Sequence, residues 1–383
     1  MTGNQKILII SVMQNWGGGE EFLLTLCKNV KDYDFIIASP EGKPFDIFRE
    51  NKIKTYNINT LKKIYRRKEG WRLSSYLKII FNIKISALRL LRLLKKENPS
   101  IILANGLFAA MYSLLLVFLA RKRFIVVQHL IFDESSIEKR IVNLVYKHAE
   151  KIICVSKAVR DNVLLILKKD SSSKVIVIPN AIKIPVDTSN RRDSDQLNIG
   201  MIGSIIRIKG IHLVIEALKN ILKNRNACLY LYGTTAGDAD SVRYESELNK
   251  MINETDLNSK IFFKGYQDSK EIIYSSLDIV INYSLVHESF SFTVLESMAY
   301  KKIIICAEEG GPREIIKNGE NGFLVSPKDV KLLERKIQFC IDSLHTEEFQ
   351  KIRENAYLTV KNKYSIEVFV TNYINLFRNQ PIL

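Results

Sequence analysis

The sequence has few cysteines and no arrangement of them that indicates a disulfide framework or a metal site. Its 383 residues include five cysteines, an odd number. None stands in a C-x-x-C pair, the spacing typical of structural zinc sites or thiol redox motifs. We therefore expect neither metal nor disulfide use, and a reducing cytosol fits this composition. The cysteines are scattered at Cys27, Cys154, Cys228, Cys306 and Cys340.

Acidic residues are scarce relative to basic ones. The chain has 57 Lys and Arg against 41 Asp and Glu, a net charge of +16. Such an excess favours anionic partners, which include nucleotide phosphates, anionic lipid and nucleic acid. The other proportions, 46% apolar and 26% charged residues, are ordinary for a globular protein. A chain of this length is expected to form two domains, each with its own core.

No secretory signal is expected, because the apolar run KILIISV is short and glycines soon follow it. Residues 101–120 form a longer run of 20 uncharged, mostly apolar residues, enough on paper to span a bilayer. Asn105 and Gly106 interrupt this run near its start. The surrounding alternation of strands and helices favours a buried strand over 101–105 and a buried helix over 107–120.

Apolar runs of strand type alternate with stretches of helical periodicity along the whole chain, as in parallel α/β folds. Residues 186–196 are polar and turn-rich without periodicity, so we expect them to form a linker. The predicted organisation is an N-terminal domain over 1–185 and a C-terminal domain over 197–363. A C-terminal helix over 364–383 is expected to pack back on the first domain.

The stretch 282–301 concentrates the candidate chemistry. An apolar strand-like run over 277–281 precedes it, a helical pattern occupies 293–300, and another β-branched run follows. This is the order of a parallel crossover unit, in which ligands bind beside strand ends and helix N-termini. Glu288 in the loop and Glu296 near the helix start could accept hydrogen bonds from sugar hydroxyls. Taken alone, these two carboxylates are explained better by a surface loop residue and a solvated helix position than by a binding site.

The same stretch resembles the signature of glycosyltransferase family 4, a large family of retaining GT-B enzymes. In that family a glutamate opens E-G-F-G, and a second glutamate follows after seven intervening residues in E-A/S-M-A. Here Glu288-Ser289-Phe290-Ser291 is followed by Glu296-Ser297-Met298-Ala299. The resemblance implies a GT-B fold, two doubly wound Rossmann-like domains facing a central cleft. It implies that the domain over 1–185 lies on the acceptor side and that the domain over 197–363 binds the nucleotide sugar. It also implies that Glu288 holds the hydroxyls of the donor sugar and that Glu296 holds the ribose.

Other segments of the C-terminal half are similar to further motifs of the family. Its G-R-L-x-x-x-K-G motif supplies an arginine and a lysine that neutralise the nucleotide diphosphate. Lys209 matches the lysine, Ser204 stands where the arginine is expected, and Arg207 three residues later is expected to supply the second charge. Tyr266 follows the glycine of a segment that borders the base, and residues 309–314 match the family's G-G-x-x-E turn.

Two features of the N-terminal half resemble the family as well. Gly17-Gly18-Gly19-Glu20, between a strand over 6–12 and a helix over 21–29, is similar to the G-G-x-E loop that faces acceptor and donor. A plain turn is the alternative. His129 ends a strand over 124–129 and matches the histidine that lines the donor sugar pocket. A packed core histidine is the commoner case for such a position.

The resemblance thus predicts a complete donor site without a metal ion. No D-x-D pair occurs in a suitable context, because Asp238 and Asp240 follow a different strand and fit a polar turn. No cofactor is expected, and a nucleoside-diphosphate sugar, with UDP as the favoured nucleotide, is the expected donor. The predicted catalytic residues are Glu288, His129 and Lys209. The predicted donor-binding residues are Gly18, Gly19, Ser204, Arg207, Lys209, Tyr266, Glu288, Ser289, Phe290, Ser291, Phe292, Thr293 and Glu296.

Residues 61–96 form a strongly basic segment with 12 Lys and Arg among aromatic and aliphatic residues. A basic amphipathic helix can lie on an anionic membrane surface. A domain helix with a solvated basic face explains the composition about as well. The resemblance favours the membrane, because the family often uses this region to approach lipid-linked acceptors.

We therefore expect a retaining, metal-independent hexosyltransferase that acts on a glycan or lipid-linked acceptor in cell-surface polysaccharide synthesis. Its expected location is the cytoplasm, peripheral on the inner membrane face, with no nucleic-acid partner. A nucleotide-sugar epimerase or a phosphorylase of the same fold remains an alternative. The first needs further acid/base residues and the second a pyridoxal lysine motif, and neither is found. A non-enzymatic basic protein that binds membranes or polyanions is the other alternative, and it rests on charge alone.

Overall fold

A computed structural model describes residues 4–62, 73–132, 136–167, 169–186 and 195–382. The chain forms two compact units, each described here by itself. The first contains residues 1–181 and 366–383, and the second contains residues 182–365. Most of the predicted linker, residues 187–194, lies outside the described residues, as do residues 63–72 of the basic segment.

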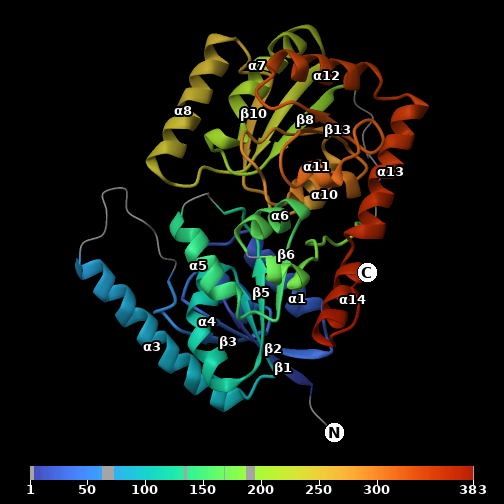
Figure 1. The fold of residues 1–383 in the computed structure, drawn as a ribbon. Helices are drawn as coiled ribbons and strands as arrows, with labels where there is room; N and C mark the ends of the chain where they lie inside the picture. The colour runs from blue at the N-terminus through green and yellow to red at the C-terminus, as the bar shows by residue number, and fades with distance from the viewer. Residues whose placement is uncertain (1–3, 63–72, 133–135, 168, 187–194, 383) are drawn as a thin grey trace. The chain divides into compact units, whose positions relative to one another are not determined.

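The first unit is built on a sheet of seven parallel strands (Figure 1). Strand β1, in the interior of the sheet, pairs with β2 on one side and β4 on the other, so that Ile7 lies opposite Phe35 and Ile101. Ile7 to Ile10 are all fully buried, which explains why the strand has an unbroken apolar sequence. The strands in spatial order are β3 (Lys54–Asn57), β2 (Tyr33–Ser39), β1 (Gln5–Ile10), β4 (Ile101–Asn105), β5 (Arg123–Gln128), β6 (Lys151–Cys154) and β7 (Val175–Val177).

Helices α3, α4, α5 and α6 of this unit lie in one row, each packed against the next. The uncharged run over 101–120 forms strand β4 and helix α4, as predicted. Within the described residues, no helix is both long and apolar enough to cross a membrane. The helices are α1 (Gly18–Asn29), α2 (Lys43–Glu50), α3 (Leu73–Glu97), α4 (Leu107–Ala120), α5 (Ser136–Tyr146), α6 (Lys157–Ile166) and α14 (Ile366–Phe377), with a 3₁₀ turn η1 (Lys169–Lys174).

Helix α14 returns to the first unit after the whole second unit and packs on α1. Its aromatic residues recur every four positions and so share one face. Phe369 and Tyr373 contact Phe22 of α1 at ring-centroid distances of 5.9 and 5.6 Å. Phe377 contacts Tyr33 of β2 at 5.0 Å. These buried rings join the C-terminal helix to the core of the first unit.

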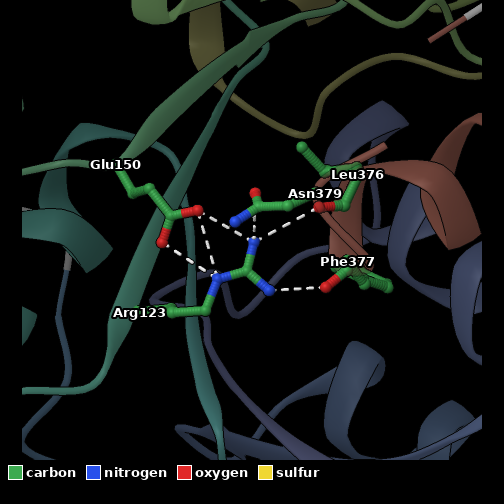
Figure 2. A network of polar contacts seen from close by, with 5 residues as sticks. All are labelled: Arg123, Glu150, Leu376, Phe377 and Asn379. Atoms are coloured by element: carbon green, nitrogen blue, oxygen red, sulfur yellow. Dashed lines mark hydrogen bonds and ion pairs between the residues drawn. The ribbon is translucent and has the colours of Figure 1, made fainter. Parts of the chain in front are cut away.

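Arg123, the first residue of β5, anchors the end of α14 (Figure 2). Its Nη2 donates to the Leu376 carbonyl at 3.3 Å and to Asn379 Oδ1 at 2.9 Å, and Nη1 donates to the Phe377 carbonyl. Nε and Nη2 also donate to the Glu150 carboxylate at 2.8–3.1 Å. A cation at a helix C-terminus satisfies free carbonyls and complements the helix dipole, so Arg123 stabilises the docked helix.

The second unit contains a six-stranded parallel sheet in the order β10-β9-β8-β11-β12-β13. Both sheets therefore begin with the 3-2-1-4 winding typical of Rossmann-like folds, which confirms the prediction of two doubly wound domains. The strands are β8 (Leu197–Ile202), β9 (Ala227–Tyr232), β10 (Ile261–Gly265), β11 (Ile279–Asn282), β12 (Ile303–Ala307) and β13 (Phe323–Val325). The helical elements are η2 (Arg207–Lys209), α7 (Ile211–Asn224), α8 (Ala239–Glu254), α9 (Lys270–Ser275), α10 (Phe292–Ala299), α11 (Pro312–Ile315), α12 (Val330–Asp342) and α13 (Glu347–Lys363).

Alternate residues of the central strands enter two separate cores. In β11, Ile279 and Ile281 belong to the core that includes α7 and α12, whereas Val280 belongs to the core that includes α10. Because both faces are covered, the strand reads as continuously apolar. Asn282 ends this buried strand with a polar side chain, which places it at the carboxyl edge of the sheet, where the loop to α10 begins.

Two predicted helix starts differ from the structure. Helix α1 begins at Gly18 and not at 21, so Gly18 and Gly19 form its first turn rather than a loop. Helix α10 begins at Phe292, one residue earlier than predicted, so Glu296 is its fifth residue and opens the second turn. Glycine has low intrinsic helix propensity, which is why the sequence pattern delays the start of α1.

Candidate active site

Glu288 lies at the centre of a polar cluster at the carboxyl edge of the second sheet. It belongs to the loop between β11 and α10, and its side chain is only 11% exposed. Lys209 Nζ forms an ion pair with Glu288 Oε1, and Asn282 Nδ2 donates to Oε2 at 3.1 Å. Both carboxylate oxygens thus have a partner, and these contacts fix the orientation of the side chain.

Asn282 connects this carboxylate to the start of α10. Its Nδ2 also contacts Ser291 Oγ at 2.8 Å. Ser291 is the N-cap residue of α10, but its side chain accepts no hydrogen bond from the helix backbone. The first-turn N–H groups of a helix have no acceptor within the helix and attract anions. The start of α10, with Phe292 and Thr293, is therefore available to an anionic group beside Lys209.

The backbone of the Glu288 loop is fixed by the glycine turn after β12. Gly311 N donates to the Glu288 carbonyl at 2.6 Å. A Cβ on Gly310, whose φ is +60°, would lie 2.2 Å from the Glu288 carbonyl oxygen. A Cβ on Gly311 would lie 2.9 Å from the Ser289 carbonyl oxygen and from Phe290 Cα. Only glycines permit this contact, so the G-G-x-x-E motif supports the loop that carries Glu288, Ser289 and Phe290.

The loop after β8 places its two basic residues in different environments. Lys209 ends the short turn η2 and reaches Glu288. Arg207 pairs instead with Glu247 of α8, and its guanidinium lies 4.8 Å from the centre of the Tyr244 ring. The structure thus brings Lys209 to the cluster and holds Arg207 against α8.

Two predicted donor contacts of this unit are solvent-exposed. Ser204 lies in the exposed loop after β8, and Tyr266, directly after β10, has 66% of its surface exposed. Their predicted roles depend on the bound donor and stay predictions.

Glu296 forms a second polar cluster on α10. Tyr274 OH donates to Glu296 Oε2 at 2.7 Å, and Lys270 Nζ lies 3.1 Å from Oε1. Both partners come from α9, which packs against α10. The Glu296 side chain is 12% exposed. Its carboxylate is therefore mostly buried, and Tyr274 and Lys270 fix its position.

In the first unit, His129 follows β5 and contacts Asn105, the last residue of β4. His129 Nε2 lies 2.7 Å from Asn105 Oδ1, and Asn105 Nδ2 donates to Glu20 Oε1 at 3.4 Å. Gly19 lies beside this pair, since a Cβ there would be 3.5 Å from both Asn105 and His129. Burial lowers the pKa of His129 from 6.5 to about 4, so the imidazole is neutral at pH 7. The Phe22 ring packs against it at 5.1 Å.

The predicted residues therefore fall into groups. Lys209, Glu288 and Ser291 come together in one cluster, with Phe292, Thr293 and Glu296 on the adjoining helix. Gly19 and His129 come together in the first unit. The sequence motifs mark Glu20 but not the other residues that hold these side chains, which are Asn282, Asn105, Tyr274 and Lys270. Asn105 and Asn282 had one local signal, because each is a polar residue at the carboxyl end of a buried apolar strand.

The D-x-D triplet has a structural role in this protein. Asp238 is the N-cap of α8, and its carboxylate accepts a hydrogen bond from Ser241 N at 2.8 Å. This agrees with the interpretation of the triplet as a polar turn. Within the described part of the chain, no three His, Cys, Asp or Glu side chains are grouped so that they could hold a metal ion.

A recess of about 840 Å³ opens at the opposite, amino edge of the first sheet. Its two arginines are paired within the protein: Arg123 with Glu150, and Arg378 with Asp32 at 2.7 Å. The recess lies away from His129 and Gly19, which are at the carboxyl edge, so we do not assign it to the candidate site.

Comparison with known families agrees with the two-unit architecture. A family described as Glycosyltransferase Family 4 matches residues 16–184. A second, described as Glycosyl transferases group 1, matches residues 186–359. The two matches leave only the chain ends and one position between them uncovered.

Individual proteins are similar to the chain at low identity. A poly(ribitol-phosphate) α-N-acetylglucosaminyltransferase of Staphylococcus aureus is 25% identical over 65% of this chain, but only 48% of its own length is matched. The capsular polysaccharide biosynthesis glycosyltransferase CapM of S. aureus is 24% identical over 95% of this chain and 94% of its own. The crystal structure of HepE from Anabaena with UDP superposes with a TM-score of 0.81 at 20% identity, covering 98% of this chain and all of HepE. HepE has also been solved with UDP-glucose.

Proposed function

Because the chain belongs to the group 1, family 4 glycosyltransferases, we propose that it transfers a sugar from a nucleoside diphosphate to a cell-surface polysaccharide or its lipid-linked precursor. Two comparisons support this proposal: HepE binds UDP and UDP-glucose, and the relatives act on poly(ribitol-phosphate) or in capsule synthesis by their names. A UDP-hexose is accordingly the proposed donor. Retention of anomeric configuration is proposed from the family resemblance of the Glu288–Glu296 segment.

The observation that carries the proposal is the cluster of Lys209, Glu288 and Asn282 at the start of α10. Transfer requires stabilisation of a departing diphosphate and of an oxocarbenium-like sugar. Lys209 and the first N–H groups of α10 supply positive charge and donors for the diphosphate. Glu288, held by Asn282, supplies an oriented acceptor for sugar hydroxyls. Glu296, more than a helical turn further on, is proposed to accept from the ribose.

His129 is proposed to contact the donor sugar as a neutral imidazole. Asn105 Nδ2 donates to Glu20, so Asn105 Oδ1 is the acceptor that faces His129. This arrangement places the proton of His129 on Nε2 and leaves Nδ1 unprotonated. With a pKa of about 4, the side chain stays in this form at neutral pH and acts as a hydrogen-bonding group.

A membrane surface is the proposed location of the acceptor. Along α3, Phe81 and Leu88 are 61% and 58% exposed, and the basic residues Lys84, Arg89 and Arg92 are exposed beside them. Helix α4, which packs on α3, exposes Phe118 and Leu119 at its end to 59% and 63%. Apolar and basic side chains on neighbouring helices suit the interface of an anionic bilayer. We therefore propose peripheral attachment to the inner face of the cell membrane.

The experiment that tests the proposal is a thermal-shift panel of UDP-, GDP- and ADP-sugars on the purified protein, followed by a transfer assay with the stabilising donor. A bound donor must raise the unfolding temperature. We expect stabilisation by a UDP-sugar and sugar transfer from it with the anomeric configuration kept. Release of an altered nucleotide sugar without transfer would support an epimerase. Stabilisation by no nucleotide sugar, together with salt-sensitive polyanion binding, would support the non-enzymatic alternative.

A further inference from the structure

We propose that Tyr274 is a positioning residue that fixes the Glu296 carboxylate for recognition of the donor's ribose. The inference rests on the proposed function, in which Glu296 accepts hydrogen bonds from the ribose hydroxyls. It adds a residue outside the set that the sequence motifs predict, and it assigns to helix α9 a part in nucleotide binding.

The Tyr274 hydroxyl is a rigidly held hydrogen-bond donor. The side chain is fully buried in the core between the sheet and α10. Its ring stacks on Tyr300 at a centroid distance of 5.1 Å and an interplanar angle of 17°. Its hydroxyl donates to Glu296 Oε2 at 2.7 Å. Burial, with the nearby Glu296 charge, raises the pKa of Tyr274 well above its usual value, so the proton that makes this bond is retained.

Helix α9 contacts both oxygens of the same carboxylate. Lys270 and Tyr274 are four residues apart, so they share one face of the helix. Lys270 Nζ lies 3.1 Å from Glu296 Oε1, but its side chain is 50% exposed. Exposed ion pairs are weak and screened by salt, whereas a hydrogen bond from a buried donor to a charged group is strong. Tyr274 is therefore the partner that determines the orientation of the carboxylate.

This orientation matters because the terminal torsion of a glutamate side chain is broad. A carboxyl group rotates over a wide range about that bond unless contacts hold it. A carboxylate has about four lone-pair sites, and the bond from Tyr274 uses one of them, so the oxygen that Tyr274 holds can still accept from a ribose hydroxyl. Without the bond, the nucleotide would have to immobilise Glu296 when it binds. The resulting loss of affinity should appear only with ligands that carry the ribose hydroxyls.

The test measures binding by calorimetry of UDP and of 2′,3′-dideoxy-UDP, which lacks both ribose hydroxyls. The variant is Tyr274→Phe, which removes only the hydroxyl. The matched control is Tyr300→Phe, which removes the hydroxyl of the stacked neighbour. We expect Tyr274→Phe to weaken UDP binding about tenfold, the effect of one hydrogen bond to a charged group. Binding of dideoxy-UDP should change less than about twofold, and Tyr300→Phe should leave both within about twofold.

The two ligands separate positioning from a general loss of structure. An equal loss of UDP and dideoxy-UDP binding in Tyr274→Phe would overturn the positioning role and leave the proposed function standing. Unchanged UDP binding in Tyr274→Phe would overturn it as well. If the wild-type protein binds neither ligand, the proposed function with a uridine donor fails, and the inference fails with it. Selective loss of UDP binding, with dideoxy-UDP binding kept, supports the inference.

Discussion

Lys209 and Glu288 form an ion pair in the candidate site, so the cation proposed to bind the diphosphate also contacts the carboxylate proposed to bind the sugar. Their ion pair is partly sheltered, with side chains 28% and 11% exposed, so it is less screened than a surface pair. A donor diphosphate would compete with Glu288 for the same ammonium group. Binding of the donor would then free Glu288 to accept from sugar hydroxyls, which links recognition of the two parts of the donor.

Replacing Lys209 by Met should cripple transfer while the protein stays folded. Charge-assisted hydrogen bonds contribute about 1.5–3 kcal/mol each, so we expect turnover to fall by about ten- to a hundredfold or more. Glu296→Ala should have a similar effect through the ribose. Steady-state transfer assays and thermal melts of both variants provide the measurement. Near-normal turnover with donor binding retained would remove both residues from the site.

Arg207→Met is the matched control for Lys209→Met. The sequence predicts a role for Arg207 in diphosphate binding, but the structure pairs its guanidinium with Glu247. We expect a smaller loss of turnover than for Lys209→Met. A loss of equal size would show that Arg207 leaves Glu247 to bind the diphosphate.

The buried imidazole of His129 should make stability depend on pH in a defined window. Its pKa is about 4 in the folded protein, against 6.5 ordinarily, so the unfolded chain binds the additional proton between these values. Stability therefore rises with pH from 4 to 6.5 and is lost as the pH falls through that window, by up to about 3 kcal/mol. Urea denaturation across this range should show that the stability of His129→Gln changes less with pH than that of the wild type. Parallel pH profiles for the two proteins would contradict the assignment.

At the scale of helices and strands, the sequence predicts the parallel strands well because their burial on both faces leaves long apolar runs. The strand over 101–105 and the helix over 107–120 are examples, and both are observed with these bounds. The start of α1 is predicted poorly, since Gly18 and Gly19 are helical against their propensity. Tertiary context decides such cases, here the contact of Gly19 with Asn105 and His129.

The candidate site is predictable only where a family motif marks it. Glu288 and Lys209 are far apart in sequence but are joined in the structure, and each belongs to a motif that can be read locally. Tyr274 carries no such signal, because an aromatic residue in a short helical stretch reads as core. Its role comes from the packing of α9 against α10, 22 positions from Glu296, and no local pattern encodes that contact.

The exposed face of helix α3 is proposed to contact the membrane, and vesicle binding can test this. If its exposed face meets anionic lipid, each cation contributes up to about 1 kcal/mol. Replacing Lys84, Arg89 and Arg92 by Ser should weaken binding to anionic vesicles by up to about 3 kcal/mol, more at low salt than at high salt. Phe81→Ser with Leu88→Ser should weaken binding with little dependence on salt. Co-sedimentation with anionic and neutral vesicles measures both effects.

The nucleotide panel is the control for these α3 variants. Lys209, Glu288 and Glu296 belong to the second unit, so donor-induced stabilisation should be unchanged in both α3 variants. Equal binding of the wild type to anionic and neutral vesicles, or no binding at all, would make the basic face a solvated one. A soluble glycan would then be the better acceptor hypothesis.

At the scale of the whole molecule, the chain divides its predicted functional residues between two units, and it contributes two separate segments to the first of them. It leaves the first unit after Ala181 and returns at Ile366. The returning helix α14 is held by Arg123 (Figure 2). It packs on Phe22, whose ring contacts His129. The end of the chain therefore supports the part of the first unit that carries a predicted catalytic residue.

We expect the whole enzyme to supply positive charge to the reaction from its own groups, without a metal ion. The net charge of +16 includes Lys209, which pairs with Glu288 in the loop before α10. We propose that this lysine and the first amides of α10 together stabilise a departing diphosphate. We expect turnover to persist in excess EDTA at close to its initial rate, because these groups occupy the role that a divalent cation has elsewhere. The measurement compares initial transfer rates after EDTA treatment and after addition of Mg²⁺ or Mn²⁺. Strict dependence on either ion would show that a metal stabilises the leaving group and would contradict the proposed metal independence.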